Sequence, residues 1–324
     1  MLIILRQETD PFFNIAAEEY LLKNFKEDIF TFWVNEPCIV VGKHQNALAE
    51  INYKYVKENG IPVIRRITGG GTVYQDAGNL NYSFILSGEK DKLIDYKKHT
   101  RPVIDFLGTL DLHAEFEAKS NLVIDGKKFS GNSAHVHRTR VIHHGTILYA
   151  SDLAQLRMAL TPGKAIFYDK SVKSNRAPVT NISDHLADKI PIGEFSALFS
   201  SYIMNNNPGS CIYHLTEGQK RAIHQLAEEK YQTYEWNFGY SPDYLFEKEF
   251  NDGVEIYKIM IRVSKGKITD ANIKRLTDDN ELKLGELMNG LPHHEGIIRE
   301  KLDNINFAGH FTHLTLEEFI NQIF

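Results

Sequence analysis

The sequence predicts an α+β protein. Helical patterns and β-branched runs are mixed along its 324 residues without a regular alternation of strand and helix. This length suits one large domain and one small domain. The pattern changes at Trp236-Asn237-Phe238-Gly239, and we place a domain boundary near residue 245. We therefore expect mixed sheets packed with helices in residues 1–245, followed by a small α+β domain in residues 246–324.

The first forty residues predict one helix between short strands. An apolar run predicts a strand at residues 2–6. Asp10-Pro11 then predicts a helix start, with Asp10 as the N-cap and Pro11 in the first turn, where a proline is tolerated. Two β-branched and aromatic runs, 29–34 and 38–41, are separated by only three residues. We interpret them as a hairpin.

The remaining elements follow from β-branched runs for strands, helical spacing of apolar residues for helices, and Gly, Pro and Asn clusters for loops. In chain order we predict a helix at 48–59, strands at 62–67 and 80–86, a helix at 93–112 that Pro102 should break or kink, strands at 115–118, 122–124 and 141–149, a helix at 152–160, an irregular loop at 161–181, helices at 194–205 and 216–231, a hairpin of strands 254–263 and 268–273, and two short closing helices.

Composition excludes several classes of protein. The 42 acidic residues outnumber the 37 Lys and Arg, for a net charge of -5, whereas a protein that coats nucleic acid is usually basic. The two cysteines, Cys38 and Cys211, lie far apart and form no CxxC pair. Neither a disulfide framework nor a thiolate zinc site is indicated.

Several common motifs and targeting segments are missing from the sequence. The N-terminal apolar run is too short for a signal peptide or a membrane helix, so we expect a cytoplasmic protein with no membrane contact. The patterns GxxxxGK[ST], GxGxxG after a strand, GxSxG and HExxH do not occur. Kinase, dinucleotide dehydrogenase, serine hydrolase and zinc protease functions therefore have no support.

The densest motif is a triple glycine, Gly69-Gly70-Gly71, directly after Arg65-Arg66-Ile67-Thr68. Glycines contribute no side-chain packing, so one interpretation is a flexible turn between strands. The other is that a ligand approaches the bare backbone and an anion meets exposed N–H groups. The preceding arginines add positive charge that suits a carboxylate or a phosphate.

A second motif, Asp125-Gly126-Lys127-Lys128-Phe129-Ser130, combines a turn with two lysines. It is either a solvated surface hairpin or a strand with one lysine directed inward. Strand alternation puts Lys128 and Ser130 on one face and Lys127 and Phe129 on the other. Small residues after Lys128 leave room for a ligand, and an inward ammonium group stabilises charge that develops on phosphoryl or acyl oxygens.

The histidine pair His143-His144 suggests a metal, with His135 and His137 nearby. Adjacent strand residues point to opposite faces, however, so the pair cannot easily share one ion. A single inward histidine that lines a pocket is the better interpretation. The pair His293-His294 is more often plain surface, and we assign it no function.

Taken in order, these segments resemble the lipoate–protein ligase family. The matching motifs are Arg65-Arg66 with the triple glycine, Asp76-Ala77-Gly78-Asn79-Leu80, Lys128-Phe129-Ser130-Gly131, His143-His144-Gly145-Thr146, Val179-Thr180-Asn181-Ile182 and Trp236-Asn237-Phe238-Gly239. The resemblance implies a catalytic α+β domain of the kind shared with biotin ligases, plus an accessory domain. It implies ATP, Mg²⁺ and lipoate as ligands. It also implies a monomer whose partners are lipoyl domains of 2-oxoacid dehydrogenase complexes or the glycine-cleavage H protein.

The resemblance also assigns roles to residues. Lys128 would be the catalytic lysine and would contact the acyl carboxyl and the α-phosphate. The positions implied to bind lipoate and phosphate are Arg66, Thr68, Gly70, Gly71 and His144. The positions implied to bind ATP and the adenylate are Gly71, Val73, Tyr74, Asn79, Asn121, Lys128, Ala134 and Thr146. The metal ligands stay open.

Two segments depart from the family pattern. Ser120-Asn121 stands where relatives often carry Asn-Asp, which affects the expected metal and nucleotide contacts. The loop over residues 173–179 is longer than the usual form, and closure over the adenylate should differ accordingly.

Two other functions remain as alternatives. One is an ATP-independent transferase that moves octanoyl or lipoyl groups between carriers, which some relatives do through a cysteine acyl-enzyme. The other is a non-catalytic binder of lipoate or of an acyl-adenylate, which an inward Lys128 disfavours because burying a lysine is costly. The sequence motifs do not distinguish lipoate from octanoate as the preferred acid, nor one carrier protein from another. We also expect Arg138, Arg140, Lys170 and Lys173 to guide an acidic carrier.

Overall fold

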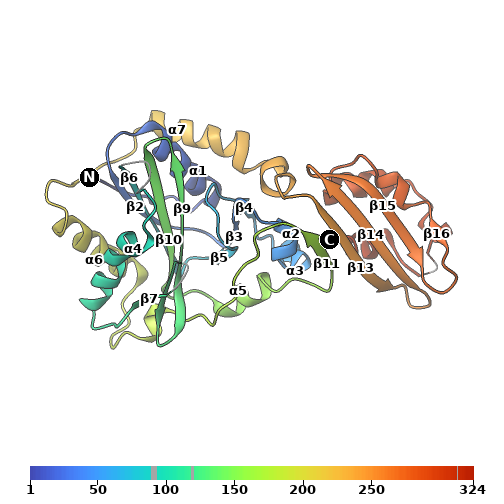
Figure 1. Ribbon diagram of the computed structural model, residues 1–324, viewed down its shortest axis with the longest axis horizontal. Helices are drawn as coiled ribbons and strands as arrows, with labels where there is room; N and C mark the ends of the chain where they lie inside the picture. The colour runs from blue at the N-terminus through green and yellow to red at the C-terminus, as the bar shows by residue number, and fades with distance from the viewer. Residues whose placement is uncertain (89–92, 118–119, 312) are drawn as a thin grey trace. The chain divides into compact units, whose positions relative to one another are not determined.

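The computed structural model describes residues 1–88, 93–117, 120–311 and 313–324, and the chain forms two compact units (Figure 1). The first unit contains residues 1–43, 62–157 and 174–232, and the second contains residues 44–61, 158–173 and 233–324. The second unit thus takes in two earlier segments as well as the residues after the predicted boundary near 245. The predicted boundary near residue 245 separates a catalytic domain from an accessory domain, and this division of roles stays a prediction.

The first unit is built on a mixed sheet of eight strands, ordered β12-β1-β2-β6-β10-β9-β8-β7. These strands are β1 (Leu2–Leu5), β2 (Ile29–Val34), β6 (Asn79–Ser87), β7 (Glu115–Glu117), β8 (Asn121–Ile124), β9 (Lys127–His137), β10 (Arg140–Leu148) and β12 (Cys211–Ile212). The β12–β1 and β1–β2 pairs are parallel, and the other pairs are antiparallel. The predicted α+β class with mixed sheets is confirmed, although residue 118 of the predicted strand 115–118 lies outside the described residues.

Helices cover both faces of this sheet. On one face, α4 (Tyr96–Gly108) and α6 (Ile192–Asn205) pack aromatic side chains against the strands, and Phe199 lies edge-on to Phe30. Helix α1 (Pro11–Asn24) lies on the other face. Its Glu18 contacts the Ser83 side chain of β6, and strand alternation directs Ser83 away from the aromatic cluster that contains the residues next to it in the strand. The predicted start of α1 is confirmed, since the Asp10 carboxylate accepts a hydrogen bond from the Phe12 N–H at 2.9 Å.

The predicted hairpin of residues 29–41 is wrong. β3 (Cys38–Val41) leaves the large sheet and forms a separate three-stranded sheet with β4 (Val63–Arg65) and β5 (Val73–Gln75). The buried Asn35 holds the crossing, because its side chain accepts from the Asn14 side chain and donates to Gln75 Oε1 at 2.6 Å. Three residues are enough for a hairpin, but here they carry the chain from one sheet to another.

Other predicted boundaries also change. The helix expected at 48–59 is two short helices, α2 (Ala47–Glu50) and α3 (Tyr53–Glu58), because Asn52 caps the second one with its side chain. Helix α4 continues through Pro102 without a break. The loop expected at 161–181 contains a strand, β11 (Ile166–Asp169). Two further α-helices are α5 (Leu153–Ala159), of which residues 153–157 belong to the first unit, and α7 (Glu217–Leu226), which continues as a π-helical turn at Ala227–Tyr231.

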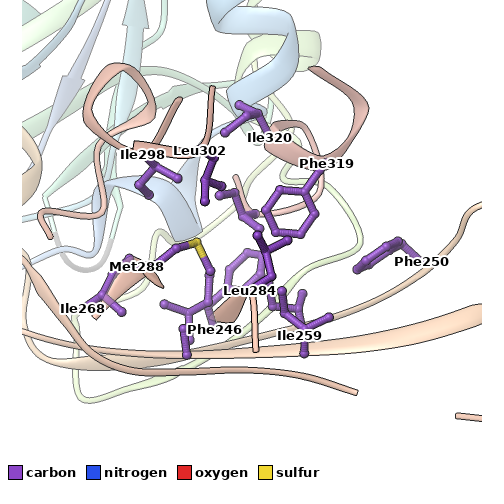
Figure 2. Close-up of a cluster of buried hydrophobic side chains, with 14 of the residues drawn as sticks. Phe246, Phe250, Ile259, Ile268, Leu284, Met288, Ile298, Leu302, Phe319 and Ile320 are labelled. Atoms are coloured by element: carbon purple, nitrogen blue, oxygen red, sulfur yellow. The ribbon is translucent and has the colours of Figure 1, made fainter. Parts of the chain in front are cut away.

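The second unit packs a five-stranded antiparallel sheet, ordered β11-β13-β14-β15-β16, against short helices. Its further elements are β13 (Tyr244–Asn251), β14 (Ile256–Ser264), β15 (Lys267–Arg275), β16 (Glu281–Leu282), α8 (Glu295–Leu302) and α9 (Leu316–Ile320). The predicted β14–β15 hairpin is confirmed, with Lys265 and Gly266 both at positive φ in its turn. Figure 2 shows the core, where Phe246, Ile259 and Leu302 meet between sheet and helices.

His293 belongs to this core and not to the surface, so the expectation of plain surface was wrong for this residue. Its Nδ1 lies 2.7 Å from the Tyr244 hydroxyl and its Nε2 lies 2.7 Å from the Ile323 carbonyl oxygen. Burial lowers the pKa of His293 to about 4. The neighbouring His294 caps α8, where its ring accepts from the Ile297 N–H.

Candidate functional site

The triple glycine begins just after β4 and is shaped by Arg66. Its Nη2 donates to the carbonyl oxygens of Gly69 at 2.6 Å and Gly71 at 2.8 Å, while Nη1 donates to Val40 O at 3.0 Å. Its Nε donates to the Thr68 hydroxyl at 2.9 Å. Because these carbonyls turn toward the guanidinium, the arginine holds the glycine loop in one conformation.

Burial lowers the pKa of Arg66 to about 10, which still leaves the guanidinium charged at neutral pH. Gly70 adopts φ +84°, a backbone conformation that favours glycine. A Cβ at Gly70 would also lie 3.1 Å from Arg66 Nη2. Gly70 is therefore required by its backbone conformation and by its close approach to Arg66, which holds the loop.

Lys128 lies in β9 at a β-bulge. Val123 pairs with Lys128 and Leu122 pairs with Ser130, so Phe129 is an additional residue in β9. The strict alternation used to assign faces does not carry across this bulge. The side chain of Lys128 instead runs beside Gly131, where an added Cβ would lie 3.0 Å from Nζ.

The environment of Lys128 is half-buried and cationic. Burial lowers the pKa of its ammonium group, and the charge of Arg66 lowers it further, while Glu117 acts in the opposite direction. Lys128 is thus close enough to Arg66, and through it to the glycine loop, for the two charges to act on each other. A partly desolvated cation of this kind interacts strongly with an anionic ligand.

A loop from Ser174 to Thr180 lies against both the glycine loop and the lysine strand. The Thr72 N–H donates to Ser174 Oγ at 2.9 Å. The Lys128 N–H donates to Pro178 O at 2.8 Å, and the Thr180 N–H donates to Lys128 O at 3.0 Å. Three segments that are distant in sequence therefore meet around Lys128.

His144 connects this loop to α1. Its Nε2 lies 2.8 Å from Thr68 Oγ and its Nδ1 lies 2.9 Å from Glu18 Oε1. Burial works to raise the pKa of Glu18, but His144 and Arg6 outweigh it and hold that pKa below its usual range. Glu18, Thr68 and the partly buried His144 form one hydrogen-bonded chain next to Arg66.

His143 points to the opposite face, as expected. Its Nε2 donates to Leu93 O at 2.9 Å, and its ring stacks on His99. The two neighbouring histidines therefore do not converge on one ion. Within the described parts of the chain, no group of three His, Cys, Asp or Glu side chains is arranged to hold a metal ion.

Several of the residues expected to contact the adenylate lie on the neighbouring strands β8, β9 and β10. The Thr146 hydroxyl on β10 accepts from the Gly131 N–H at 3.4 Å, and Asn121 on β8 pairs with the same glycine. Ala134 lies further along β9, beside the Tyr96 hydroxyl. Asn121 and Thr146 therefore flank Gly131, beside which the Lys128 ammonium group lies.

Val73 and Tyr74 lie on β5, and Asn79 lies on β6. The side chains of Tyr74 and Asn79 form hydrogen bonds within the protein. The buried Tyr74 hydroxyl donates to Gln155 Oε1 at 2.9 Å, and the buried Asn79 amide donates to Asn81 Oδ1 at 3.0 Å. Val73 is half-buried. Roles for these three residues in binding a nucleotide remain predictions.

The unusual Ser120 stabilises the site from outside. It adopts φ +98°, its hydroxyl donates to Asn132 O at 2.7 Å, and its own carbonyl accepts from the Asn132 side chain at 3.0 Å. This exchange clamps the start of β8 onto β9. The serine therefore has a structural function at the position where the sequence departs from the family pattern.

Several residues of the site were not found from the sequence. Glu18, Tyr96 and Ser133 contact His144, Ala134 and the Gly69 carbonyl, respectively. One available signal was a pair of acidic residues, 18 and 19, on an otherwise apolar part of α1. Such carboxylates are seldom buried without partners. Tyr96 and Ser133 carry no local signal, since only the fold brings them near the glycine loop.

Two of the four residues expected to guide an acidic carrier, Arg140 and Lys173, contact other groups of the protein. The Arg140 guanidinium is buried and donates to the carbonyl oxygens of Lys26 at 2.5 Å and Glu27 at 2.7 Å. Lys173 forms a salt bridge with Asp169 at 2.8 Å. The Arg140 guanidinium is thus held by the protein, whereas Lys173 keeps 51% of its side-chain exposure, and its role in guiding a carrier stays a prediction. No helix in the described part of the chain has the length and hydrophobicity needed to span a bilayer.

Comparison with known proteins agrees with this geometry. The chain is 37% identical to lipoate-protein ligase LplJ of Bacillus subtilis, and the alignment covers 100% of both proteins. It also resembles the bipartite lipoate protein ligase of Thermoplasma acidophilum, solved in a study of that ligase and its E2 lipoyl domain, with TM-score 0.64 and 24% identity over 74% of this chain and 96% of that one. A lipoate-protein ligase A bound with ATP matches with TM-score 0.63 and 24% identity, over 74% of this chain and 98% of that one.

The family model for the lipoyl protein ligase A/B catalytic domain matches residues 10–204, more than half of the chain. That match includes the glycine loop, Lys128 and His144. With a 37% identical relative that aligns over its full length, this chain belongs to the lipoyl protein ligase A/B family.

Proposed function

We propose that this chain is an ATP-dependent lipoate–protein ligase. It activates lipoate as lipoyl-AMP and transfers the lipoyl group to a lysine of a carrier protein. The observation that carries the proposal is a half-buried Lys128 next to a glycine loop held by Arg66. Support comes from the full-length relative, a lipoate-protein ligase by name, and from the structural neighbour that is bound with ATP.

Lys128 is the proposed catalytic residue. In the first step a carboxylate oxygen of lipoate attacks the α-phosphorus of ATP, and the bond to pyrophosphate breaks. In the second step the carrier amine attacks the acyl carbon, AMP leaves, and the amine releases a proton. Negative charge develops on the same phosphoryl and acyl oxygens in both steps, so one fixed cation stabilises both.

The remaining site residues divide into two proposed groups. Lipoate and its carboxylate lie against Arg66, Thr68, Gly70, Gly71 and His144. The nucleotide lies against Gly71, Val73, Tyr74, Asn79, Asn121, Ala134 and Thr146. Arg66 acts mainly by holding the loop, because its donors already bind loop carbonyls.

Magnesium belongs to this proposal only as a companion of the nucleotide. Mg²⁺ is commonly held by phosphate oxygens with one or two carboxylates. The described residues offer no cluster of three acidic, histidine or cysteine side chains for a resident ion. We therefore derive no step of the reaction through a protein-bound metal.

We extend the proposal to organisation and partners. Catalysis belongs to residues 1–245, and residues 246–324 form an accessory domain. The enzyme is a cytoplasmic monomer, and its acceptors are lipoyl domains or the glycine-cleavage H protein. Lipoyl domains are supported by the archaeal ligase that was studied with its E2 lipoyl domain.

The test is lipoate-dependent exchange of pyrophosphate into ATP, followed by the mass of an apo lipoyl domain after reaction. Lys128→Ala should slow the exchange by about 10²–10³-fold, the usual effect of losing one donor that stabilises the transition state. Lys127→Ala is the matched control, since that neighbouring lysine is exposed. Normal turnover by Lys128→Ala would overturn this assignment.

The same assay separates the cysteine-dependent alternative. Cys38 is buried, and burial raises the pKa of its thiol, which disfavours the reactive thiolate. A carrier that gains an acyl group from another acyl carrier without ATP would instead identify a transferase.

A further inference from the structure

Five basic side chains gather beside the glycine loop, and the sequence did not single them out together. Lys43, His137, Glu19 and Lys23 all act electrostatically on His135, and Glu19, Lys23 and Lys43 act on Lys230. We call Lys23, Lys43, His135, His137 and Lys230 the basic rim. They come from the end of α1, the end of β3, the end of β9 and the turn after α7.

The basic rim carries net positive charge. Glu19 is the carboxylate at its centre, and it accepts from Lys23 at 2.5 Å and Lys230 at 2.7 Å. Three ammonium groups against one carboxylate leave two positive charges at neutral pH. Burial, followed by the nearby lysine charges, lowers the pKa of His135, so the rim already disfavours a further positive charge. An approaching anion reduces the repulsion among the positive charges of such a surface.

The rim adjoins the proposed active site through the backbone. The Lys43 N–H donates to Thr68 O at 2.8 Å, one residue before the triple glycine. Ser133, two residues before His135, donates to Gly69 O at 2.9 Å. The rim is also partly exposed, because Lys23 retains 48% of its side-chain exposure and Lys230 retains 25%.

We propose that the basic rim is the docking surface for the acceptor protein, and that it selects a domain with an acidic surface around its target lysine. This inference rests on the proposed function. An acceptor lysine must reach the acyl carbon beside the glycine loop, so the surface that carries it has to cover the neighbouring residues. The chain as a whole has a charge of -5, which repels an acidic domain from most of the surface. The positive charge of the basic rim attracts such a domain to this part of the surface.

The test uses the full chain and a net-negative apo lipoyl domain as the probe. Lys43→Glu should raise the KM for the domain by about fivefold with little change in kcat, because charges at the edge of an interface act mainly on association. Lipoate-dependent pyrophosphate exchange should stay within about twofold of wild type, since the adenylation step needs no carrier. Lys189→Glu makes the same charge change at an exposed residue of the first unit and should leave the KM unchanged.

Salt provides a second readout that a purely structural role would not move. The KM of the wild-type enzyme for the domain should rise as NaCl increases from about 0.05 to about 0.5 M, and the Lys43→Glu variant should respond less. An unchanged KM in Lys43→Glu overturns the docking proposal. A parallel fall in pyrophosphate exchange also overturns it, since the rim would then serve the triphosphate. If wild-type enzyme performs no lipoate-dependent exchange, the proposed function itself fails, and docking falls with it.

Discussion

Arg66 and Lys128 are neighbouring cations with different tasks. The planar guanidinium of Arg66 donates hydrogen bonds to the backbone carbonyl oxygens of Val40, Gly69 and Gly71. The ammonium of Lys128 is half-buried, and its pKa is lowered by burial and by Arg66. One cation therefore builds the loop, while the other is destabilised in its charged state until an anion arrives.

The glycines of the loop differ in what they require. An added Cβ at Gly71 would lie 2.9 Å from Ser174 Oγ and 3.2 Å from Ser174 Cα, whereas an added Cβ at Gly69 meets nothing within 4 Å. Gly71→Ala should therefore displace the Ser174 loop and lower pyrophosphate exchange by about tenfold or more, because small misplacements of catalytic groups are costly.

Gly69→Ala is the matched control for this prediction. It adds the same methyl group two residues away and should retain most of the exchange activity. Ser174→Gly should restore part of the activity in the Gly71→Ala background, because it removes the Oγ and Cβ atoms that clash. Equal losses from the two alanine variants would show that the contact with Ser174 is not the cause.

At the scale of elements, α1 is the support of the site. It places Glu18 against His144 and Glu19 inside the basic rim. The helix starts where the sequence indicates, because the Asp10 side chain satisfies the Phe12 N–H that would otherwise lack a partner at the helix end. Errors in this start would shift both carboxylates.

Loss of the Asp10 cap should therefore destabilise the first unit. Asp10→Ala is expected to lower the free energy of unfolding by about 1 kcal/mol, the typical effect of removing an N-cap side chain. Chemical denaturation followed by circular dichroism measures the change. Asp188→Ala alters an exposed aspartate of the same unit and should have little effect. A change as large as that of Asp10→Ala in the control would discount the cap.

At the scale of the molecule, each of the two compact units has its own hydrophobic core. The first is centred on Phe30, Phe106 and Phe199, and the second on Phe246, Ile259 and Leu302. In the second core a neutral His293 links Tyr244 to the backbone of Ile323. That bond joins the sheet of the second unit to the end of the chain.

This buried histidine makes the stability of the second unit depend on pH. Its pKa is about 4 in the folded protein, below the ordinary value of 6.5, so the unfolded chain binds the proton more tightly. The contribution is complete above about pH 6.5 and is lost toward about pH 4, and it amounts to about 3 kcal/mol by linkage. Denaturation at a series of pH values measures it. His293→Gln keeps similar hydrogen-bonding groups but does not titrate, and it should flatten this part of the profile. An unchanged profile would contradict the prediction.

Local chemistry was readable from the sequence where the physical cause is local. The cap at Asp10, the turn at Lys265-Gly266 and the opposite directions of His143 and His144 depend on neighbouring residues only. The glycine loop and Lys128 were also singled out, because backbone freedom and an inward cation carry recognisable residue types. The family resemblance supplied their order and their expected roles.

The fold decided what depends on distant segments. Residues 29–34 and 38–41 read as a hairpin, yet a buried amide chain through Asn35 sends them into different sheets. The sequence indicated that Arg66 contacts a ligand. In the fold, backbone carbonyl oxygens accept hydrogen bonds from its guanidinium, so Arg66 supports the glycine loop. The basic rim arises from four separate elements with no shared motif. The sequence by itself therefore determined the family, the class of fold and the chemical types in the site. Which side chains meet was settled only when long-range pairing satisfied buried polar groups, because such pairing depends on the whole chain at once.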